Sequence, residues 1–209
     1  MVQWFTSLLF YEYNMRAMKK HYAIIISGPS GVGKGTIIRM IKEKHQIPVS
    51  VSHTTRKFRE GEKEGIDYFF VTKDKFFELV DAGNFIEWEK VHDNYYGTHA
   101  INIETIEHTN LLFEVDVKGA LRLMQRIKDV GSNYISVFLD APSTDDLINR
   151  LKFRGSETEE SIQLRMQTAK KEFSQKKHFD YVVVNDTISS AFLKIEEILK
   201  HKGVLQDEA

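Results

Sequence analysis

The residues with the clearest capacity for chemistry lie near the amino terminus, where glycines and a lysine follow a short apolar run. They match the spacing G-x-x-x-x-G-K of a phosphate-binding loop: Gly28, Pro29, Ser30, Gly31, Val32, Gly33 and Lys34. Glycines let the backbone turn so that successive N–H groups point at phosphate oxygens, and the lysine adds a cation. This pattern predicts a nucleotide site with Lys34 beside the β- and γ-phosphates. A glycine-rich turn with a surface lysine is the simpler alternative.

The position after the lysine departs from the commonest form of such loops. Many carry a serine or threonine there as a ligand of Mg²⁺, whereas this chain has Gly35, followed by Thr36. We therefore expect Mg²⁺ to be held mainly by the nucleotide phosphates and water. Asp116 is predicted at the carboxyl end of a strand, with Glu114 two residues earlier on the same face, and is placed to orient one of those waters.

A second polar group is rich in arginine and tyrosine. Arg56 and Arg59 lie three residues apart, and Tyr68 and Tyr96 follow. Guanidinium groups bind a phosphate monoester through paired, charge-assisted hydrogen bonds, which a lysine does less well. A single arginine is more often a surface residue, but this group predicts a second phosphate site. Phosphoryl transfer between two such sites needs positioning and charge neutralisation, and no covalent intermediate.

These residues must be positioned by strands and helices, which the sequence shows as apolar runs that alternate with segments of helical periodicity. The run Tyr22 to Ser27 has no polar alternation, which is typical of a strand covered on both faces in a parallel sheet. Further strands are predicted at 111–117, 134–139 and 181–184, and helices at 36–45 and 119–130. This order predicts a doubly wound α/β fold whose phosphate loop joins the first strand to the first helix.

The chain is interpreted as one domain with an extension and two irregular regions. The expected parts are an N-terminal extension at 1–20 and a domain at 21–209, with its core at 21–50 and 101–209, a partly β inserted lobe at about 51–100 and a helical lid at about 150–165. In the lobe we expect a core of phenylalanines, namely Phe69, Phe70, Phe76 and Phe77. Ser143 is the expected N-cap and Gly155 the expected stop of the helix that enters the lid, and the next helix is expected to end near Lys177.

Composition narrows the possible partners. The 209 residues are 42% apolar and 28% charged, which is typical of a globular protein, and a net charge of −1 predicts no nucleic acid and no membrane as a partner. The absence of cysteine excludes disulfides and agrees with a cytoplasmic location. The apolar patch from Trp4 to Tyr11 is too short to span a bilayer and lacks the pattern of a secretory signal. We expect residues 1–20 to be flexible, with a partner-binding helix as the alternative.

Several of these motifs, in this order, resemble those of the guanylate kinase family, and the resemblance extends from about Tyr22 to Leu199. The shared pieces are the GPSGVGK loop, SHTTR-x-x-R-x-G-E at 52–62 with Asp67 and Tyr68, FIEW at 85–88, YYGT at 95–98 and RGSETEES at 154–161. The resemblance implies a P-loop nucleoside monophosphate kinase that transfers the γ-phosphoryl group of ATP, with Mg²⁺, to GMP and also dGMP. Phe58 stands where the family usually has proline, and Gly35 where it usually has serine or threonine.

The resemblance also implies a role for each matching residue. The catalytic residues would be Lys34, Arg56, Arg154 and Arg165. ATP would bind the loop 28–34 together with Gly35, Thr36, Arg150 and Asn185. On the GMP side, the phosphate would bind Arg56, Arg59, Tyr68 and Tyr96, and the base Ser52, Glu87 and Thr98, with Asp116 beside them. Because water competes with GMP as acceptor, we expect the lobe and lid to close over both substrates.

Two other functions remain as alternatives. One is a kinase for another nucleoside or sugar phosphate on the same scaffold, which Ser52, Glu87 and Thr98 argue against. The other is a non-enzymatic interaction module, since guanylate-kinase-like domains also serve in scaffold proteins; the retained Lys34 argues against it. The eight histidines form no evident ligand set, so no metal besides Mg²⁺ is expected. The sequence predicts no particular protein partner or oligomeric state.

Overall fold

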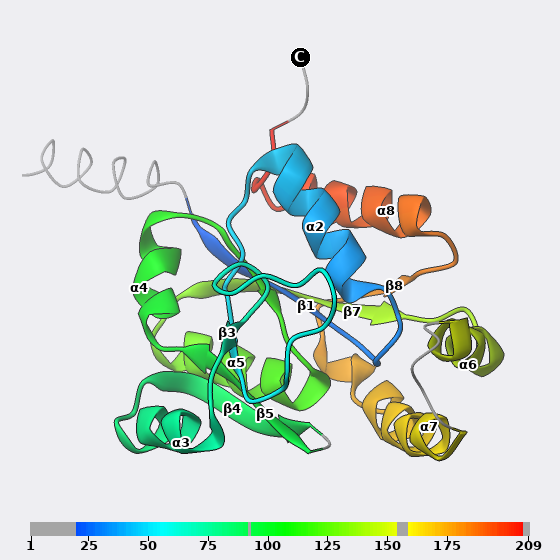
Figure 1. Cartoon of the computed structure of the whole chain (residues 1–209). Coiled ribbons are helices and arrows are strands. Elements are labelled where there is room, and N and C mark those ends of the chain that lie inside the picture. Colours follow the sequence, from blue (N-terminus) through cyan, green and yellow to red (C-terminus); the bar gives the residue numbers. More distant parts are fainter. Residues whose placement is uncertain (1–19, 92, 154–158, 207–209) are drawn as a thin grey trace, which may run out of the picture.

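A four-stranded parallel sheet forms the centre of the protein (Figure 1). The computed structural model describes residues 20–91, 93–153 and 159–206. The strands are β1 (Tyr22–Ser27), β6 (Leu111–Glu114), β7 (Asn133–Asp140) and β8 (Tyr181–Val184), in the spatial order β6-β1-β7-β8. Ile24 of β1 lies opposite Leu112 on one side and Ile135 on the other. The predicted parallel sheet is therefore confirmed, with β1 at its centre.

Helices cover both faces of this sheet, as a doubly wound fold requires. Helices α2 (Lys34–His45) and α8 (Ile188–His201) pack on the face that Ile24 and Ile26 bury. Helices α4 (Ile101–His108) and α5 (Val117–Asp129) pack on the face that Ala23 and Ile25 bury. Each fully buried isoleucine contributes about 1.5–3 kcal/mol relative to exposure. The unbroken apolar run of β1 is thus explained by cover on both sides.

A second, mixed sheet forms a separate lobe. Its strands are β2 (His53–Thr54), β3 (Phe69–Phe70), β4 (Phe85–Val91) and β5 (Asn94–His99), in the order β3-β2-β5-β4, and helix α3 (Lys73–Asp81) packs against them. Phe76 of α3 is fully buried, with its ring centre 4.8 Å from that of Phe85. The predicted role of Phe76 in the lobe core is confirmed. Phe69 is 38% exposed because β3 is a short edge strand, so its prediction as a core residue was wrong.

The lobe is fastened to the core through β4 and α5. The Nη1 atom of Arg122 on α5 donates a hydrogen bond of 2.8 Å to the carbonyl oxygen of Trp88, and its Nη2 atom lies 3.0 Å from the Glu89 carboxylate. These bonds anchor strand β4, which carries Glu87, next to the central sheet.

Two further helices follow β7 along the chain. They are α6 (Thr144–Phe153) and α7 (Glu159–Phe173), followed by the 3₁₀ turn η1 (Lys176–His178). The Oγ of Ser143 accepts a hydrogen bond of 3.0 Å from the N–H of Asp146, which confirms the predicted N-cap. The predicted stop at Gly155 lies outside the described residues. Helix α7 ends at Phe173 rather than near Lys177, because the chain turns there to bury Phe179 and enter β8. None of the described helices is long and apolar enough to cross a membrane.

Candidate active site

The phosphate loop connects β1 to α2, as predicted. Gly28 has a φ of 141°, and a Cβ atom there would lie 2.2 Å from the carbonyl oxygen of Leu139, so only glycine fits. Lys34 is the first residue of α2, and its ammonium group donates hydrogen bonds to the carbonyl oxygens of Gly28 (2.6 Å) and Pro29 (3.1 Å). The cation is therefore folded back over the loop, at the start of a helix whose dipole favours anions.

Arg165 and Asn185 meet the loop from α7 and from the end of β8. The Nη1 atom of Arg165 donates a hydrogen bond of 2.6 Å to the Oγ of Ser30. Asn185 is fully buried, and its side-chain amide donates to the carbonyl oxygen of Val32 at 2.7 Å. Asn185 thus supports the loop backbone from within the core.

Arg150 on α6 joins the same region through a main-chain contact. Its Nη2 atom donates to the carbonyl oxygen of Asn185 at 2.8 Å. Helix α6, strand β8 and the phosphate loop are therefore linked by hydrogen bonds. Arg154, one of the predicted catalytic residues, lies outside the described residues.

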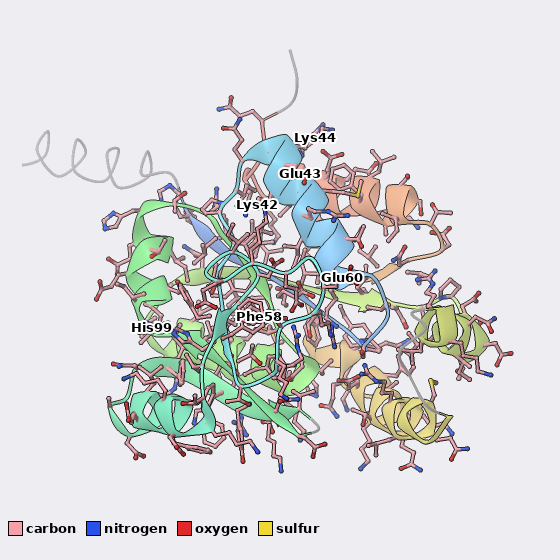
Figure 2. The ribbon with its side chains drawn as sticks, in the orientation of Figure 1. Lys42, Glu43, Lys44, Phe58, Glu60 and His99 are labelled. Atoms are coloured by element: carbon pink, nitrogen blue, oxygen red, sulfur yellow. The ribbon has the colours of Figure 1, made fainter. Side chains whose placement is uncertain are left out.

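A cavity of about 230 Å³ lies between the loop, the lobe and helix α7. The predicted residues that line it are Gly28, Ser30, Gly31, Gly33, Lys34, Gly35, Ser52, Arg59, Tyr68, Glu87, Tyr96, Asp116 and Arg165. A second cavity, of about 580 Å³, lies beside helix α2 and the segment 56–68 and is lined by Thr36, Arg56 and Glu62 among others. Figure 2 labels Lys42 on α2 and Phe58 and Glu60 on that segment, which passes in front of the central sheet. The structure thus gathers most of the predicted residues around two cavities that share wall residues.

Glu87 is the buried acid of the first cavity. It is only 7% exposed, and its Oε1 accepts a hydrogen bond of 2.6 Å from the Oγ1 of Thr98, which is fully buried behind it. Burial raises the pKa of Glu87 to about 7, although the Thr98 hydroxyl opposes that rise, and the nearby charge of Asp116 adds to it. A Cβ on Gly119 would lie 2.9 Å from Glu87 Oε2, so a glycine on α5 makes room for this carboxylate.

The members of the arginine and tyrosine group line the two cavities. The rings of Tyr68 and Tyr96 lie 5.9 Å apart, and the guanidinium of Arg56 lies 5.3 Å from the Tyr68 ring centre. Burial raises the pKa of Tyr68, so its hydroxyl stays a hydrogen-bond donor. Arg56 lines the second cavity, whereas Arg59 lines both.

Glu114 and Asp116, the two carboxylates predicted beside the loop, both line the first cavity, but Asp116 is not at the end of a strand as predicted. Strand β6 ends at Glu114, and Asp116 is the N-cap of α5, where its Oδ1 accepts a hydrogen bond of 2.8 Å from the N–H of Gly119. Asp116 is therefore not a strand residue, because its side chain is committed to starting the next helix. Glu114 lines both cavities, and a Cβ on Gly35 would lie 3.3 Å from Glu114 Oε2. The space left by the missing side chain at position 35 is thus bordered by a carboxylate.

Sequence reasoning missed Glu172, which faces the first cavity from α7. It lines that cavity with Arg165 and Thr168, at the spacing of one helix face. Burial raises the pKa of Glu172 to about 6, and the charge of Lys34 opposes this rise. The helical spacing from Arg165 could have indicated it. No group of three or more histidine, aspartate or glutamate side chains is arranged to hold a metal ion within the described residues.

The fold and the two cavities define a P-loop phosphotransferase of the nucleoside monophosphate kinase class. The family model described as guanylate kinase matches residues 20–202. The chain is 40% identical over 185 residues to a guanylate kinase of Clostridioides difficile, covering 87% of this chain and 88% of that protein. It is 42% identical over 179 residues to one of Clostridium perfringens, covering 84% and 81%. The chain belongs to the guanylate kinase family.

Solved structures agree with this family. The crystal structure of guanylate kinase from Anaplasma phagocytophilum superposes with a TM-score of 0.73 at 31% identity, covering 90% of this chain and 88% of that one. A shikimate kinase from Bacteroides thetaiotaomicron superposes with a TM-score of 0.50 at 16% identity, covering 86% and 98%. At that identity the second match shows a shared fold alone.

Proposed function

We propose that the chain transfers the γ-phosphoryl group of ATP to GMP, and also to dGMP, giving ADP and the nucleoside diphosphate. The observation that supports this best is the position of Glu87, a buried carboxylate held by Thr98 in a cavity whose other wall is the phosphate loop. Guanine offers adjacent N1–H and N2–H donors that a carboxylate accepts as a pair, whereas adenine has an acceptor at N1. Ser52, also buried, lies in the same wall.

The surrounding charges suit an in-line transfer. Lys34 and Arg165 lie at the loop, where the β- and γ-phosphates of ATP would bind, and Arg56 and Arg59 hold the acceptor phosphate with Tyr68 and Tyr96. Each cation stabilises charge that spreads over the transferring group in the transition state. Closure of the lobe and of helices α6 and α7 over both substrates would exclude water as a competing acceptor.

The residues near Gly35 fit a bound Mg²⁺. This cation prefers oxygen ligands and keeps several waters, and the Glu114 carboxylate borders the loop beside Lys34. We propose that Glu114 holds the ion, directly or through water, and that Asp116 contributes only through a more distant water. When bound, Mg²⁺ neutralises charge on the β- and γ-phosphates of the nucleotide.

The interaction-module alternative is not favoured by the loop. Lys34 keeps its contacts with the loop carbonyls, and Arg165 reaches Ser30 across the cavity. A module that binds only peptides has no use for a lysine and an arginine placed at a glycine-rich phosphate loop.

A panel of acceptors tests the proposed function. The purified chain is incubated with Mg²⁺, ATP and one of GMP, dGMP, AMP, CMP or UMP, and ADP formation is followed with a coupled assay. We expect turnover with GMP and dGMP and little with the others. Preference for another acceptor would refute the base assignment, and no turnover with any nucleotide would refute the kinase function.

A further inference from the structure

Glu62 makes a group of hydrogen bonds that the reaction described above does not use. Its Oε1 accepts from Arg56 Nη2 at 2.7 Å, and its Oε2 accepts from Arg56 Nη1 at 2.9 Å. The same Oε2 accepts from the backbone N–H of Arg59 at 2.8 Å. One carboxylate therefore holds both arginines assigned to the acceptor phosphate, one by its side chain and the other by its main chain.

These contacts fix the orientation of the Arg56 guanidinium. Nη1 also donates to the carbonyl oxygen of Lys57 at 2.7 Å, so both of its hydrogens are used on the Glu62 side. The planar guanidinium of Arg56 lies over the rings of Tyr68 and Phe70, with its Cζ atom 5.3 and 5.6 Å from their centres. Its remaining edge, formed by Nε and the second hydrogen of Nη2, is used by neither Glu62 nor the Lys57 carbonyl oxygen.

Glu62 is itself held in place by the turn that contains Arg59. Its own N–H donates to the carbonyl oxygen of Arg59 at 3.1 Å, which complements the bond from the Arg59 N–H to its carboxylate. Its side chain is only 17% exposed. Burial raises the pKa of Glu62, but the hydrogen bonds and charges of the two arginines outweigh burial and lower it. The pair is thus a built feature of the segment, whose removal would release Arg56.

We propose that Glu62 is a positioning residue for the acceptor: it binds one end of the Arg56 guanidinium, so that the edge formed by Nε and Nη2 meets the phosphate of GMP. This inference rests on the proposed function, because it takes that phosphate as the ligand of Arg56 and Arg59. It predicts an effect opposite in sign to simple electrostatics. A carboxylate close to a bound dianion repels it, so charge alone would make GMP bind more tightly once Glu62 is neutralised.

Equilibrium binding separates the two effects. Kd values for GMP and for guanosine, which lacks the phosphate, are measured by calorimetry on the wild type, on Glu62→Gln and on Glu60→Gln. Glu60 is an exposed carboxylate of the same segment, so its substitution removes the same charge without touching Arg56. We expect Glu62→Gln to weaken GMP about 10-fold or more, the scale of one charged hydrogen bond, with guanosine changed less than about 2-fold. Glu60→Gln should leave GMP unchanged or slightly tighter.

A double-mutant cycle shows whether Glu62 acts through Arg56. In an Arg56→Lys background the bidentate pairing with Glu62 is lost. Adding Glu62→Gln to that background should therefore raise the Kd for GMP far less than it does in the wild type. Thermal melting checks that each variant is folded, and Glu62→Asp, one methylene shorter, replaces Glu62→Gln if the latter is not. The shorter carboxylate keeps the charge but not the reach, so it should also weaken GMP.

Four results would overturn the inference. They are unchanged or tighter GMP binding in Glu62→Gln, an equal loss for guanosine, an equal loss in Glu60→Gln, and an additive cycle with Arg56→Lys. Failure of the proposed function looks different, because the wild type itself would then not convert GMP to GDP in the presence of ATP.

Discussion

Replacing Glu87 with glutamine keeps the size of the side chain and removes a charge that burial makes costly. In the folded protein the pKa of Glu87 is raised from its usual 4.5 to about 7. At ~1.4 kcal/mol per unit, the ionised carboxylate costs about 3 kcal/mol of folding stability. That cost is absent below pH 4.5, where the carboxyl is protonated in both the folded and unfolded states. It grows as pH rises and is complete above about pH 7.

The same charge is what the base is expected to need. Guanine donates two hydrogen bonds to the ionised carboxylate, and losing charged bonds worth about 1.5–3 kcal/mol lowers kcat/KM for GMP by on the order of 10²-fold. A glutamine amide still accepts one of them but sets its NH₂ against the other donor. AMP should be rejected less strongly, because the repulsion between adenine N1 and a buried carboxylate oxygen is gone. Glu87→Gln should therefore have a lower kcat/KM for GMP and a higher free energy of unfolding than the wild type.

Two measurements on the same variant test this reasoning. Thermal melting should show Glu87→Gln more stable than the wild type by about 5–10 °C at pH 8, with the difference vanishing near pH 4.5. Steady-state assays should show the loss with GMP and a narrower ratio of GMP to AMP. The control is Glu89→Gln, since Glu89 lies two residues along the same strand but is paired with Arg122 and should gain no stability. Equal melting temperatures at pH 8, with unchanged kcat/KM for GMP, would remove Glu87 from the base pocket.

Three further substitutions test other parts of the structure. Lys34→Ala should lower kcat by several orders of magnitude while the melting temperature stays near that of the wild type; wild-type turnover would exclude a catalytic role. Asn185→Ala leaves the Val32 carbonyl without its buried donor, so it should lower stability by about 1–3 kcal/mol in denaturant unfolding, and no loss would show that water replaces the amide. Glu196 on α8 lies 2.8 Å from the Nζ of Lys44 and 2.5 Å from the Nε2 of His45, both on α2; burial raises the pKa of Glu196, but its hydrogen bonds with Lys44 and His45 lower it overall. The stability that ionised Glu196 contributes should be present above its usual pKa of 4.5 and be lost as pH falls through the lowered pKa. In Glu196→Gln the free energy of unfolding should therefore depend less on pH below about pH 4.5 than it does in the wild type.

Local patterns were sufficient for the core of the fold. The strand at Tyr22–Ser27 and the glycine loop after it were predicted at the observed positions, because an unbroken β-branched run and a fixed glycine spacing are properties of neighbouring residues. The strand at Tyr181–Val184 and the cap at Ser143 follow from equally local signals. The strand predicted at 111–117 was too long, because apolar Val115 and Val117 continue its pattern although Asp116 starts a helix.

The roles of individual carboxylates depended on residues distant in sequence. Nothing near Glu114 in the chain shows that its side chain borders Gly35, which lies on another element of the fold. Likewise, Glu172 enters the cavity only because α7 packs across the phosphate loop, where Arg165 meets Ser30. Composition and spacing treat these acids as equivalent, whereas burial and neighbouring charge make them different.

The sequence by itself therefore determined the class of chemistry: a phosphate loop, a second group of phosphate-binding arginines and an α/β core to hold them, all encoded in short spacings. Only the tertiary structure decided how that chemistry is arranged. Packing of β4 against α5 buries Glu87 beside Gly119 and raises its pKa, and the turn at Arg59 aligns Glu62 with Arg56. The physical reason is that desolvation and charge coupling act through space, between atoms that folding brings together, and neither can be read from the order of residues.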